Sequence, residues 1–297
     1  MRISLRQLKV FRMVASCLNY TRASEKLFMS QPAVSKQVKL LEEEVGVSLF
    51  EKVGKKIFLT DAGVDMQNYA ESILGLVAEA KNHFAEMKGG HKGRLKVAVA
   101  STASSFAIEM LGNFRNLYPE VDFDIEVANR QALLSKVDKN LVDLVIMGQP
   151  PEKSHYSIEP FMKNPLVFIA QPKHPLVGKT VSVKELIKEP FVAREESSGT
   201  RQAMESFFRG QEDNLQIGML FNSNDSIKSA VNSGFGLSLV SIHTIQVELE
   251  HASLAVLQVE GTPIERYWYL VHLQEKRLSP VAEAFRKFIL DETALSI

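Results

Sequence analysis

The sequence predicts an α/β protein with an all-α, winged helix-turn-helix domain at its N-terminus, a long linker helix, and a two-lobed α/β domain after it. Three observations predict this fold class. Two short helical patterns meet at a break near Met29 and Ser30. A long apolar pattern of helical period then runs from Thr60 to Met87, and from Arg94 onward buried strands alternate with amphipathic helices. Helical spacing indicates amphipathic helices, and alternating strands and helices are typical of parallel sheets covered by helices.

The composition is that of an ordinary globular protein, with 45% hydrophobic and 24% charged residues in 297 residues, a length that suggests two or three domains. The N-terminal segment lacks the apolar stretch of a signal peptide, and no later run reaches the length needed to span a bilayer. The one cysteine, Cys17, excludes an internal disulfide framework and is predicted to be a buried structural thiol. We expect a cytoplasmic protein with no membrane contact.

The charges are distributed unevenly along the chain. The whole sequence balances 35 Lys and Arg residues against 35 Asp and Glu residues, but residues 1–60 contain eleven Lys and Arg residues against five Glu residues. A basic head therefore precedes an acidic body. This asymmetry is expected if only the N-terminal end meets nucleic acid.

Residues 5–17 are predicted to form the first helix, and residues 21–45 a helix-turn-helix. Gln31 and Pro32 open the second helix of this motif. Proline suits this position because its missing N–H costs little in the first turn of a helix. The apolar face of that helix consists of Ala33, Val34, Val38, Leu41 and Val45, and the opposite face displays Ser35, Lys36, Gln37 and Lys39. Short polar and basic side chains in this position suit the major groove of DNA. On spacing alone, a helical hairpin with a solvated charged face explains the pattern equally well.

A small β-wing is predicted between Phe50 and Thr60, with Gly54 at its turn and lysines at its tip. Lysines on the wing and on the second helix would mainly contact phosphates, whereas Ser35 and Gln37 are the candidates for base edges, and Pro32 with Ala33 could meet a thymine methyl. The candidate DNA-binding residues are Thr21, Arg22, Gln31, Pro32, Ala33, Ser35, Lys36, Gln37, Lys39, Lys52, Lys55 and Lys56.

A long helix is predicted from Thr60, whose side chain can cap it, to about Met87. The 28 residues would span roughly 42 Å. An apolar heptad seam runs through Met66, Ile73, Ala80 and Met87, interleaved with Tyr69, Leu76 and His83. Packing on the body of the same chain is one explanation, but pairing with a second copy is preferred because two reading heads match a two-fold related DNA site. Residues 89–93 are predicted to be a flexible linker.

From Arg94 onward two α/β units are predicted. The first unit has strands at 95–100, 121–127 and 143–148 and helices at 104–117 and 130–139. This order implies a parallel sheet with helices on both faces. The second unit has strands at 166–170, 191–193, 218–221 and 236–240 and helices at 183–187, 200–209, 225–232 and 242–249. A strand at 267–273 and a helix at 280–290 should return to the first unit, so crossings near 161–165 and 263–267 would act as hinges between two lobes.

Hydroxyl, amide and glycine residues follow several of these strands, where ligands gather in open α/β sheets. Plain helix capping explains any single cluster more simply, but several clusters that converge on one cleft would favour a carboxylate or phosphate ligand. The candidate residues are Ser101, Thr102, Asn129, Arg130, Gly148, Gln149, Ser198, Gly199, Thr200, Arg201 and Asn224.

The N-terminal motifs resemble those of LysR-type transcriptional regulators. They are the L-x-x-F of the first helix, T-R-A-S-E-K-L, Q-P-A-V-S-K-Q-V-K-L-L-E, and the L-F wing that ends in L-T-D-A-G. The second half resembles regulators of Calvin-cycle carbon-fixation operons through the segments VAVASTASSFA, VANRQALL, DLVIMGQPPE, NPLVFIAQPKHPL, REESSGTRQAMESFF, NSNDSIKSAV, GLSLVS and RYWYLVHLQEKRLSP. Together the resemblance covers essentially the whole chain.

This resemblance implies a sequence-specific, DNA-binding transcriptional regulator, with no catalytic residue and no cofactor. Its effector domain would resemble a periplasmic solute-binding protein and hold a small anionic metabolite, such as a sugar phosphate, between its lobes. Double-stranded DNA, a homodimer or homotetramer, and RNA polymerase are the implied partners. Glu195 and Glu196 depart from this picture, since two carboxylates would repel an anion unless they point outward or pair with Arg194 or Arg201. Sensing of an aromatic or aliphatic acid in another pathway is the alternative.

The predicted domains are a winged helix-turn-helix at 1–60, a linker helix at 61–88, a flexible linker at 89–93, and an effector domain at 94–297. Lobe I would comprise about 94–161 and 267–297, and lobe II about 162–266.

Two other classes of protein fit less well. An enzyme on the two-lobed fold would need a catalytic motif, but none is present, and neither Ser101 nor Ser198 has a base that the sequence nominates. His155, His174 and His243 lack metal-ligand spacing, so no metal is expected. A solute receptor for transport conflicts with the missing signal peptide and the basic head.

Overall fold

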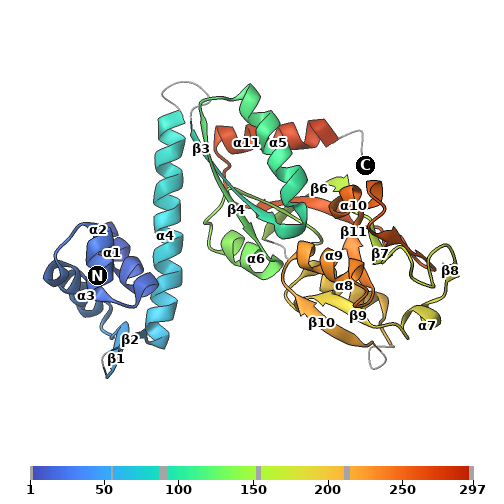
Figure 1. Ribbon diagram of the computed structural model, residues 1–297. Coiled ribbons are helices and arrows are strands. Elements are labelled where there is room, and N and C mark those ends of the chain that lie inside the picture. Colours follow the sequence, from blue (N-terminus) through green and yellow to red (C-terminus); the bar gives the residue numbers. More distant parts are fainter. Residues whose placement is uncertain (1–2, 55, 87–92, 152–154, 211–214, 294–297) are drawn as a thin grey trace. The chain divides into compact units, whose positions relative to one another are not determined.

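The computed structural model describes residues 3–54, 56–86, 93–151, 155–210 and 215–293 (Figure 1). Two compact units make up the chain, one formed mainly by the first 88 residues and the other by most of the remainder. Each unit is described by itself. Lys55 at the tip of the predicted wing, Met87, and residues 89–92 of the predicted linker lie outside the described residues.

The N-terminal unit contains a three-helix domain, a two-stranded wing and a long helix (Figure 1). Its elements are α1 (Leu5–Cys17), α2 (Tyr20–Leu27), α3 (Gln31–Val45), β1 (Phe50–Val53), β2 (Lys56–Leu59) and α4 (Asp61–Glu86). β1 and β2 pair antiparallel, and Gly54 between them has a φ of +62°, a conformation that favours glycine in a tight turn. The helix-turn-helix and the wing predicted from the sequence are confirmed.

The break between α2 and α3 is set by backbone geometry and capping. Phe28 has a φ of 52°, in the left-handed region that ends a helix, and Met29 N–H donates to the Ser24 carbonyl oxygen at 3.0 Å. The Ser30 hydroxyl then accepts a hydrogen bond from Ala33 N–H at 3.4 Å and caps α3, which has Pro32 in its first turn. These caps fix where the outward face of α3 begins.

The core of this unit holds α3 against α1 and α4. One cluster joins Phe11 of α1 to Leu41 of α3 and Ala70 of α4, and a second joins Val14 to Ala23 and Val34. Cys17, predicted to be buried, is only partly buried because it lies at the last residue of α1.

The long helix α4 packs on the domain with one face and leaves another uncovered. Ala70 and Leu74 are buried against α1, whereas Tyr69, Ile73 and Leu76 are exposed. Met66 lies one heptad before Ile73 but is partly buried against the domain core, so the exposed part of the predicted seam begins at Tyr69. Thr60 caps the helix as predicted, since its Oγ1 accepts from Gly63 N–H at 3.0 Å.

Gly63 permits the close approach of α4 to the wing. A Cβ at this position would lie 2.0 Å from the Leu49 carbonyl oxygen, and backbone cannot rotate away as a side chain can. We expect Gly63→Ala to lower the free energy of unfolding of the N-terminal domain by about 2 kcal/mol, as overpacking typically does. Urea denaturation followed by circular dichroism measures this change.

Gly112 offers the matched control. It lies inside a helix, where an added Cβ meets no described atom within 4 Å. Gly112→Ala should therefore be neutral or stabilise by about 0.5–1 kcal/mol, since alanine favours helix over glycine. Similar denaturation midpoints for both variants would contradict the explanation given for Gly63.

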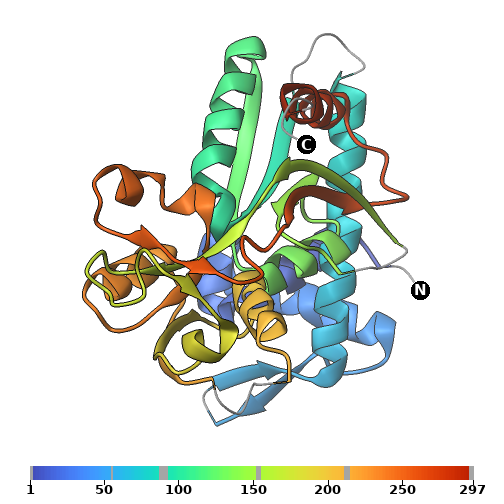
Figure 2. The same ribbon diagram turned by 90° about the vertical axis from the view of Figure 1, so that its right-hand side faces the viewer.

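The second unit has two lobes, of which the first is built on one five-stranded sheet and the second on smaller groups of paired strands. Lobe I contains β3 (Gly93–Ala100), η1 (Ser101–Ala103), α5 (Ser104–Leu117), β4 (Val121–Ala128), α6 (Arg130–Asp138), β5 (Leu144–Met147), β6 (Tyr156–Lys163), β14 (Tyr267–Leu273) and α11 (Pro280–Thr293). Its sheet has the strand order β4-β3-β5-β14-β6. β3, β4 and β5 are parallel, whereas β14 is antiparallel to both of its neighbours. Figure 2 shows the red C-terminal segment lying among the green strands of this lobe.

Lobe II contains β7 (Leu166–Ala170), β8 (Thr180–Val181), α7 (Val183–Leu186), β9 (Phe191–Arg194), α8 (Gly199–Phe207), β10 (Ile217–Phe221), α9 (Asn224–Asn232), β11 (Ser238–Ser241), η3 (Ile242–Thr244), α10 (Gln246–Glu250), β12 (Ala255–Val256) and β13 (Gln258–Val259). β9 pairs with β10, and β7 lies between β11 and β12. Val192 N–H donates to the Leu237 carbonyl oxygen at 2.8 Å and links these two groups of strands.

Successive strand residues point to opposite sides of a strand, and in both lobes helices pack against both sides of the central strands. In lobe I, Val97 packs with α5 and α11, while its neighbour Ala98 packs with α6. In lobe II, Phe168 packs with α8, while Ile169 packs with α9.

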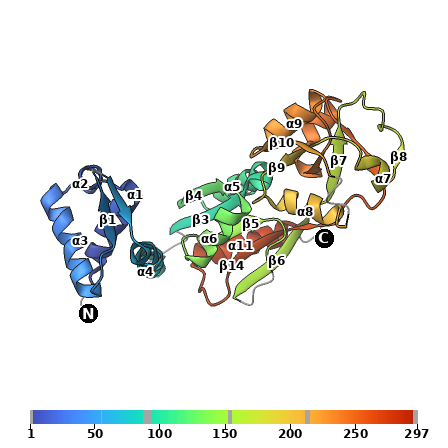
Figure 3. The ribbon, with the colours of Figure 1, turned by 90° about the horizontal axis from the view of Figure 1, so that it is seen from below.

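Two corrections to the predicted architecture concern lobe I. The sheet is mixed rather than parallel, because β14 enters it between β5 and β6. Residues 161–163, predicted to belong to a crossing, form the end of β6, which pairs with β14 along its length (Figure 3). The two crossings between the lobes run side by side, with Asn164 N–H donating to the Arg266 carbonyl oxygen at 2.6 Å and Leu166 N–H to the Ile264 carbonyl oxygen at 3.0 Å.

Candidate functional site

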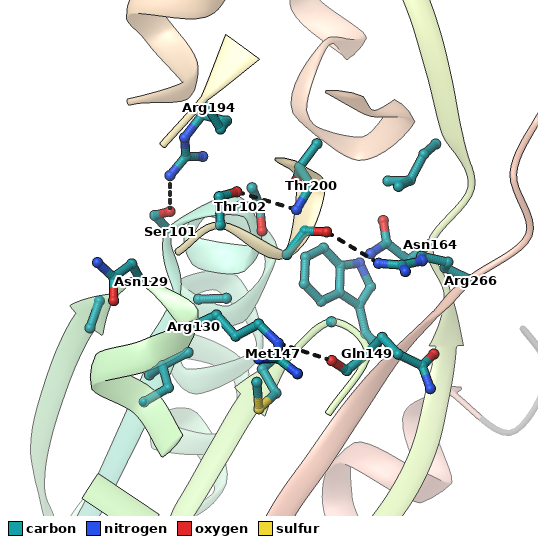
Figure 4. A pocket seen from close by; sticks show the side chains of 18 residues that line it. Ser101, Thr102, Asn129, Arg130, Met147, Gln149, Asn164, Arg194, Thr200 and Arg266 are labelled. Carbon is teal, nitrogen blue, oxygen red and sulfur yellow. Dashed lines mark hydrogen bonds between the residues drawn. The ribbon is translucent and has the colours of Figure 1, made fainter. Parts of the chain in front are cut away.

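A polar pocket lies between the two lobes of the second unit (Figure 4). It encloses about 520 Å³, part of which is open to solvent. Segments that follow β3, β4, β5 and β9 line it, together with the two crossings between the lobes. The pocket therefore lies at the carboxyl ends of the strands, as predicted for a ligand site in such sheets.

Local structure holds the polar residues of this pocket in place. Ser101 and Thr102 form a 3-10 turn directly after β3. The Asn129 Oδ1 accepts a hydrogen bond from Ala132 N–H at 3.0 Å at the start of α6. The buried Ser198 caps α8, with its Oγ accepting from Thr200 N–H at 3.2 Å. Asn129 and Ser198 thus cap helices and line the pocket at the same time.

Most of the ligand-binding residues predicted from the sequence come together here. Those that line the pocket are Ser101, Thr102, Asn129, Arg130, Gly148, Gln149, Ser198, Gly199 and Thr200. They come from segments up to about a hundred positions apart in the chain, so their convergence depends on the fold.

Arg201 and Asn224 do not line the pocket, which corrects two of the predicted positions. Arg201 pairs instead with Glu205 one turn along α8, Nε to Oε1 at 2.6 Å, and is held outside. Asn224 lies behind the pocket, where its Oδ1 accepts from Arg194 Nη1 at 2.7 Å.

Sequence reasoning missed four lining residues that carry polar side-chain atoms, namely Asn164, Arg194, Arg266 and Trp268, besides apolar ones. Arg194 ends β9, while Asn164 and Arg266 lie at the crossings and Trp268 lies within β14. An arginine at the carboxyl end of a predicted buried strand was an available signal for Arg194. No local sequence pattern predicts that the side chains of the other three residues line the pocket.

Arg130 and Arg266 supply uncompensated positive charge to the pocket. Arg130 Nε donates to the Gln149 carbonyl oxygen at 3.4 Å, and Arg266 Nη1 to the Gly199 carbonyl oxygen at 3.3 Å. Among the lining residues there is no Asp or Glu, and among described residues no carboxylate forms an ion pair with either guanidinium. Burial lowers the pKa of both arginines, and for Arg266 the charge of Arg130 adds to the decrease while Tyr269 opposes it. The two guanidiniums thus repel each other, and an anion would relieve this repulsion.

Arg194 differs from these two arginines because a carboxylate pairs with it. Its side chain is buried, and its Nε and Nη2 donate to the two carboxylate oxygens of Glu195 at 2.8 and 3.1 Å. Glu196 is exposed and does not line the pocket. The conflict that these two glutamates posed in the sequence is therefore resolved by pairing and by outward placement.

Two buried polar atoms of lining residues have no hydrogen-bond partner among the described residues. They are Oδ1 of Asn164 and Nε1 of Trp268. An unpaired buried polar atom is costly, and such atoms in a pocket are available to a ligand.

Apart from Lys55, which lies outside the described residues, the candidate DNA-binding residues lie on α2, α3 and the strands of the wing. The exposed ones are Thr21, Arg22, Gln31, Pro32, Lys36, Lys39, Lys52 and Lys56. Ala33, Ser35 and Gln37 are partly buried, since they flank the core residues Val34 and Val38. Lys39 has Glu43 nearby, 3.9 Å away, but keeps most of its side chain in solvent. Among the candidate residues of α3, the exposed charged side chains are therefore those of Lys36 and Lys39.

Features of an enzyme or a metal site are not found in the part of the chain that the structure describes. No group of three His, Cys, Asp or Glu side chains there could hold a metal ion. His155, His174 and His243 contact Asp138, Glu189 and the Lys163 carbonyl respectively, and none of these contacts involves Ser101 or Ser198. None of the described helices is long and apolar enough to cross a membrane.

Two family models match the chain and together span nearly all of it. The bacterial regulatory helix-turn-helix protein model of the LysR family matches residues 5–64, and the LysR substrate binding domain model matches residues 88–294. The chain belongs to the LysR family.

Its relatives include transcriptional regulators, one of them named for the RuBisCO operon. The RuBisCO operon transcriptional regulator of Allochromatium vinosum is 48% identical over 99% of this chain and 98% of that protein. The transcriptional activator CmpR of Synechocystis is 38% identical over 99% of this chain and 97% of its own length. The regulatory domain of Synechocystis CcmR, solved in complex with 2-PG, is 35% identical, covers 67% of this chain and 97% of that domain, and has a TM-score of 0.65.

The fold and the family agree with the resemblance found in the sequence motifs, which is thereby confirmed. The chain is a DNA-binding transcriptional regulator with a two-lobed effector domain, and not an enzyme. Regulators of this family bind DNA and small-molecule effectors.

Proposed function

We propose that this regulator controls genes of carbon fixation or related central-carbon metabolism, and that a small anionic metabolite bound in the pocket changes its DNA binding. The observation that carries the proposal is the pair of partly buried arginines, Arg130 and Arg266, which face one pocket whose lining contains no carboxylate. The name of the Allochromatium relative supports the choice of target genes. The 2-PG bound to the CcmR domain supports the choice of ligand class.

A ligand between the lobes can act by favouring one arrangement of the lobes over another. It shifts the equilibrium only by the difference between its affinities for the two arrangements. The two crossings at Asn164 and Arg266 carry pocket residues themselves, so a ligand held there would act directly on the connection between the lobes. We propose that this change reaches the DNA-binding heads through the dimer or tetramer.

An aromatic or aliphatic acid is the alternative effector. A single carboxylate would balance one of the two arginines and leave the other partly buried and without a counter-charge, which is unfavourable. A phosphate, or a phosphate together with a carboxylate, balances both. The charge of the pocket therefore favours the more strongly anionic class.

The proposal is tested by calorimetry and gel shift with the full chain. The DNA is the region upstream of the neighbouring, divergently transcribed gene, and the probes are phosphosugars, phosphorylated acids and benzoate. Tight binding of phosphorylated probes that also changes the gel-shift pattern is the expected result. Binding of benzoate alone would favour the alternative effector class, and no change in DNA binding with any bound probe would contradict effector control.

The exposed residues of α4 support a homodimer, or a homotetramer built from dimers. Tyr69, Ile73 and Leu76 form an uncovered apolar stripe on this helix. Leu76→Glu would place a charge in the proposed interface, so we expect the dimer dissociation constant to rise by about tenfold or more. Analytical ultracentrifugation measures it. Asn68→Glu, exposed on the same helix about 100° around from Tyr69, is the control and should leave it unchanged.

We propose a DNA-binding domain at 1–60, a linker helix at 61–88, a flexible linker at 89–93, and an effector domain at 94–297 with its lobes divided near 162 and 266. The regulator would act in the cytoplasm on double-stranded DNA and, where it activates transcription, contact RNA polymerase. The twelve DNA-binding positions stay candidates for the contacts described above.

A further inference from the structure

We propose that Glu195 determines which anions the pocket accepts, by neutralising Arg194 and so limiting the charge available to a ligand. The proposal rests on the anionic effector proposed above and deepens it. Arg130 and Arg266 would provide the two charges that bind the effector, and the Arg194–Glu195 pair would provide hydrogen bonds without net charge.

The contacts of Arg194 show that its charge is balanced from behind the pocket. Its side chain is 4% exposed and makes a two-point bond with Glu195, Nε to Oε2 at 2.8 Å and Nη2 to Oε1 at 3.1 Å. Nη1 donates to Asn224 Oδ1 at 2.7 Å, and Nη2 also donates to the Asn222 carbonyl oxygen at 3.2 Å. A guanidinium bonded in this fork geometry is strongly fixed.

The same guanidinium reaches the other lobe. Its Nη2 donates to Ser101 Oγ at 3.3 Å, and Arg194 lines the pocket (Figure 4). A ligand that lies against Ser101 would therefore meet Arg194, but it would meet a cation already paired with a carboxylate.

Glu195 is held in place by its backbone and lies outside the pocket lining. Its N–H donates to the Phe221 carbonyl oxygen at 3.1 Å, and its carbonyl oxygen accepts from Ser198 N–H at 2.9 Å. Its side chain is 24% exposed, whereas the arginine it neutralises is almost fully enclosed. The carboxylate thus sets the local charge without competing with a ligand for space.

The pairing of Arg194 with Glu195 would affect which anions the pocket prefers. The attraction between the pocket and a ligand grows with the product of their charges, so a third uncompensated arginine would help a more highly charged ligand more than a less charged one. Glu195→Gln removes the carboxylate charge and keeps an amide oxygen that can accept one Arg194 bond. It should therefore shift preference towards the more charged of two ligands with the same shape.

The test compares glycerol 3-phosphate with 3-phosphoglycerate, which share a carbon skeleton and differ by one carboxylate. Calorimetry on the full chain gives the ratio of their affinities for wild type, Glu195→Gln and Glu196→Gln. We expect Glu195→Gln to raise the preference for 3-phosphoglycerate by about fivefold or more. The neighbouring Glu196 is exposed and outside the pocket lining, so Glu196→Gln should keep the wild-type ratio.

A double variant checks that the effect comes from the charge of Arg194. Arg194→Met combined with Glu195→Gln removes both charges and should return the ratio towards wild type. An unchanged ratio in Glu195→Gln, an equal change in Glu196→Gln, or a ratio that stays high in the double variant would overturn the role of Glu195 alone. If the wild-type protein binds neither probe, the proposal of an anionic effector is contradicted, and so is the role proposed for Glu195.

Discussion

Replacing Lys36 with glutamate is expected to abolish specific DNA binding, with a loss of affinity of about 100-fold or more. Lys36 is exposed on the outward side of α3, close in sequence to the exposed Pro32 and Lys39. The change replaces an attraction to the phosphate backbone with a repulsion, and a dimer would carry it twice. Gel-shift titration on the divergent promoter region at fixed salt measures the loss.

Lys184→Glu provides the control for this variant. Lys184 is exposed on α7 of the effector domain. Reversing its charge changes the net charge of the protein by the same amount, but at a site outside α3. We expect DNA affinity within about twofold of wild type for Lys184→Glu and unchanged effector binding for both variants. Wild-type DNA affinity for Lys36→Glu would defeat the assignment of α3 as the recognition helix.

Removal of Arg130 is expected to lower the affinity for 3-phosphoglycerate by about 100-fold. Arg130 is partly buried, a bound phosphate would enclose it further, and truncating one partner of a buried charge pair typically costs about 2–5 kcal/mol. Arg130→Met retains much of the aliphatic length of the side chain and loses the guanidinium. Without ligand the variant should be at least as stable as wild type, since the charge of Arg130 disfavours that of Arg266. Calorimetry measures the affinity, and thermal denaturation without ligand measures the stability.

Arg201→Met is the matched comparison for Arg130→Met. Arg201 pairs with Glu205 and does not line the pocket, so its loss should change the affinity by less than about threefold. A loss at Arg201 as large as the loss at Arg130 would show that the anion binds elsewhere.

The features that the sequence predicts well are those that depend on neighbours along the chain. Ser30 and Pro32 mark the start of α3 through capping and a fixed φ, and both act within one turn. The serine and threonine residues after β3 and β9 follow buried strands that are visible as apolar runs. Because ligands bind where such strands end, the positions of most pocket residues follow from local pattern and a general rule of topology.

The features that the sequence does not predict depend on partners far along the chain. β6 contains Pro160 and an uneven pattern, and it forms a strand because β14, more than a hundred positions later, pairs with it. Pro160 is tolerated since β6 lies at the edge of the sheet. Arg194 and Arg266 enter the pocket through tertiary packing. The prediction that Arg201 lines the pocket was wrong for a local reason. Glu205 lies four residues further along the same helix and forms an ion pair with Arg201.

The place of β14 in the sheet of lobe I has a consequence for biosynthesis. Lobe II is built from one continuous stretch of chain, so it can complete its fold while the ribosome is still translating the C-terminal end. Lobe I cannot, since β14 separates β5 from β6 and α11 covers the same core, and both emerge last. Until then β5 and β6 present unpaired edges that invite aggregation, so a nascent chain stalled before Tyr267 would be a substrate for chaperones.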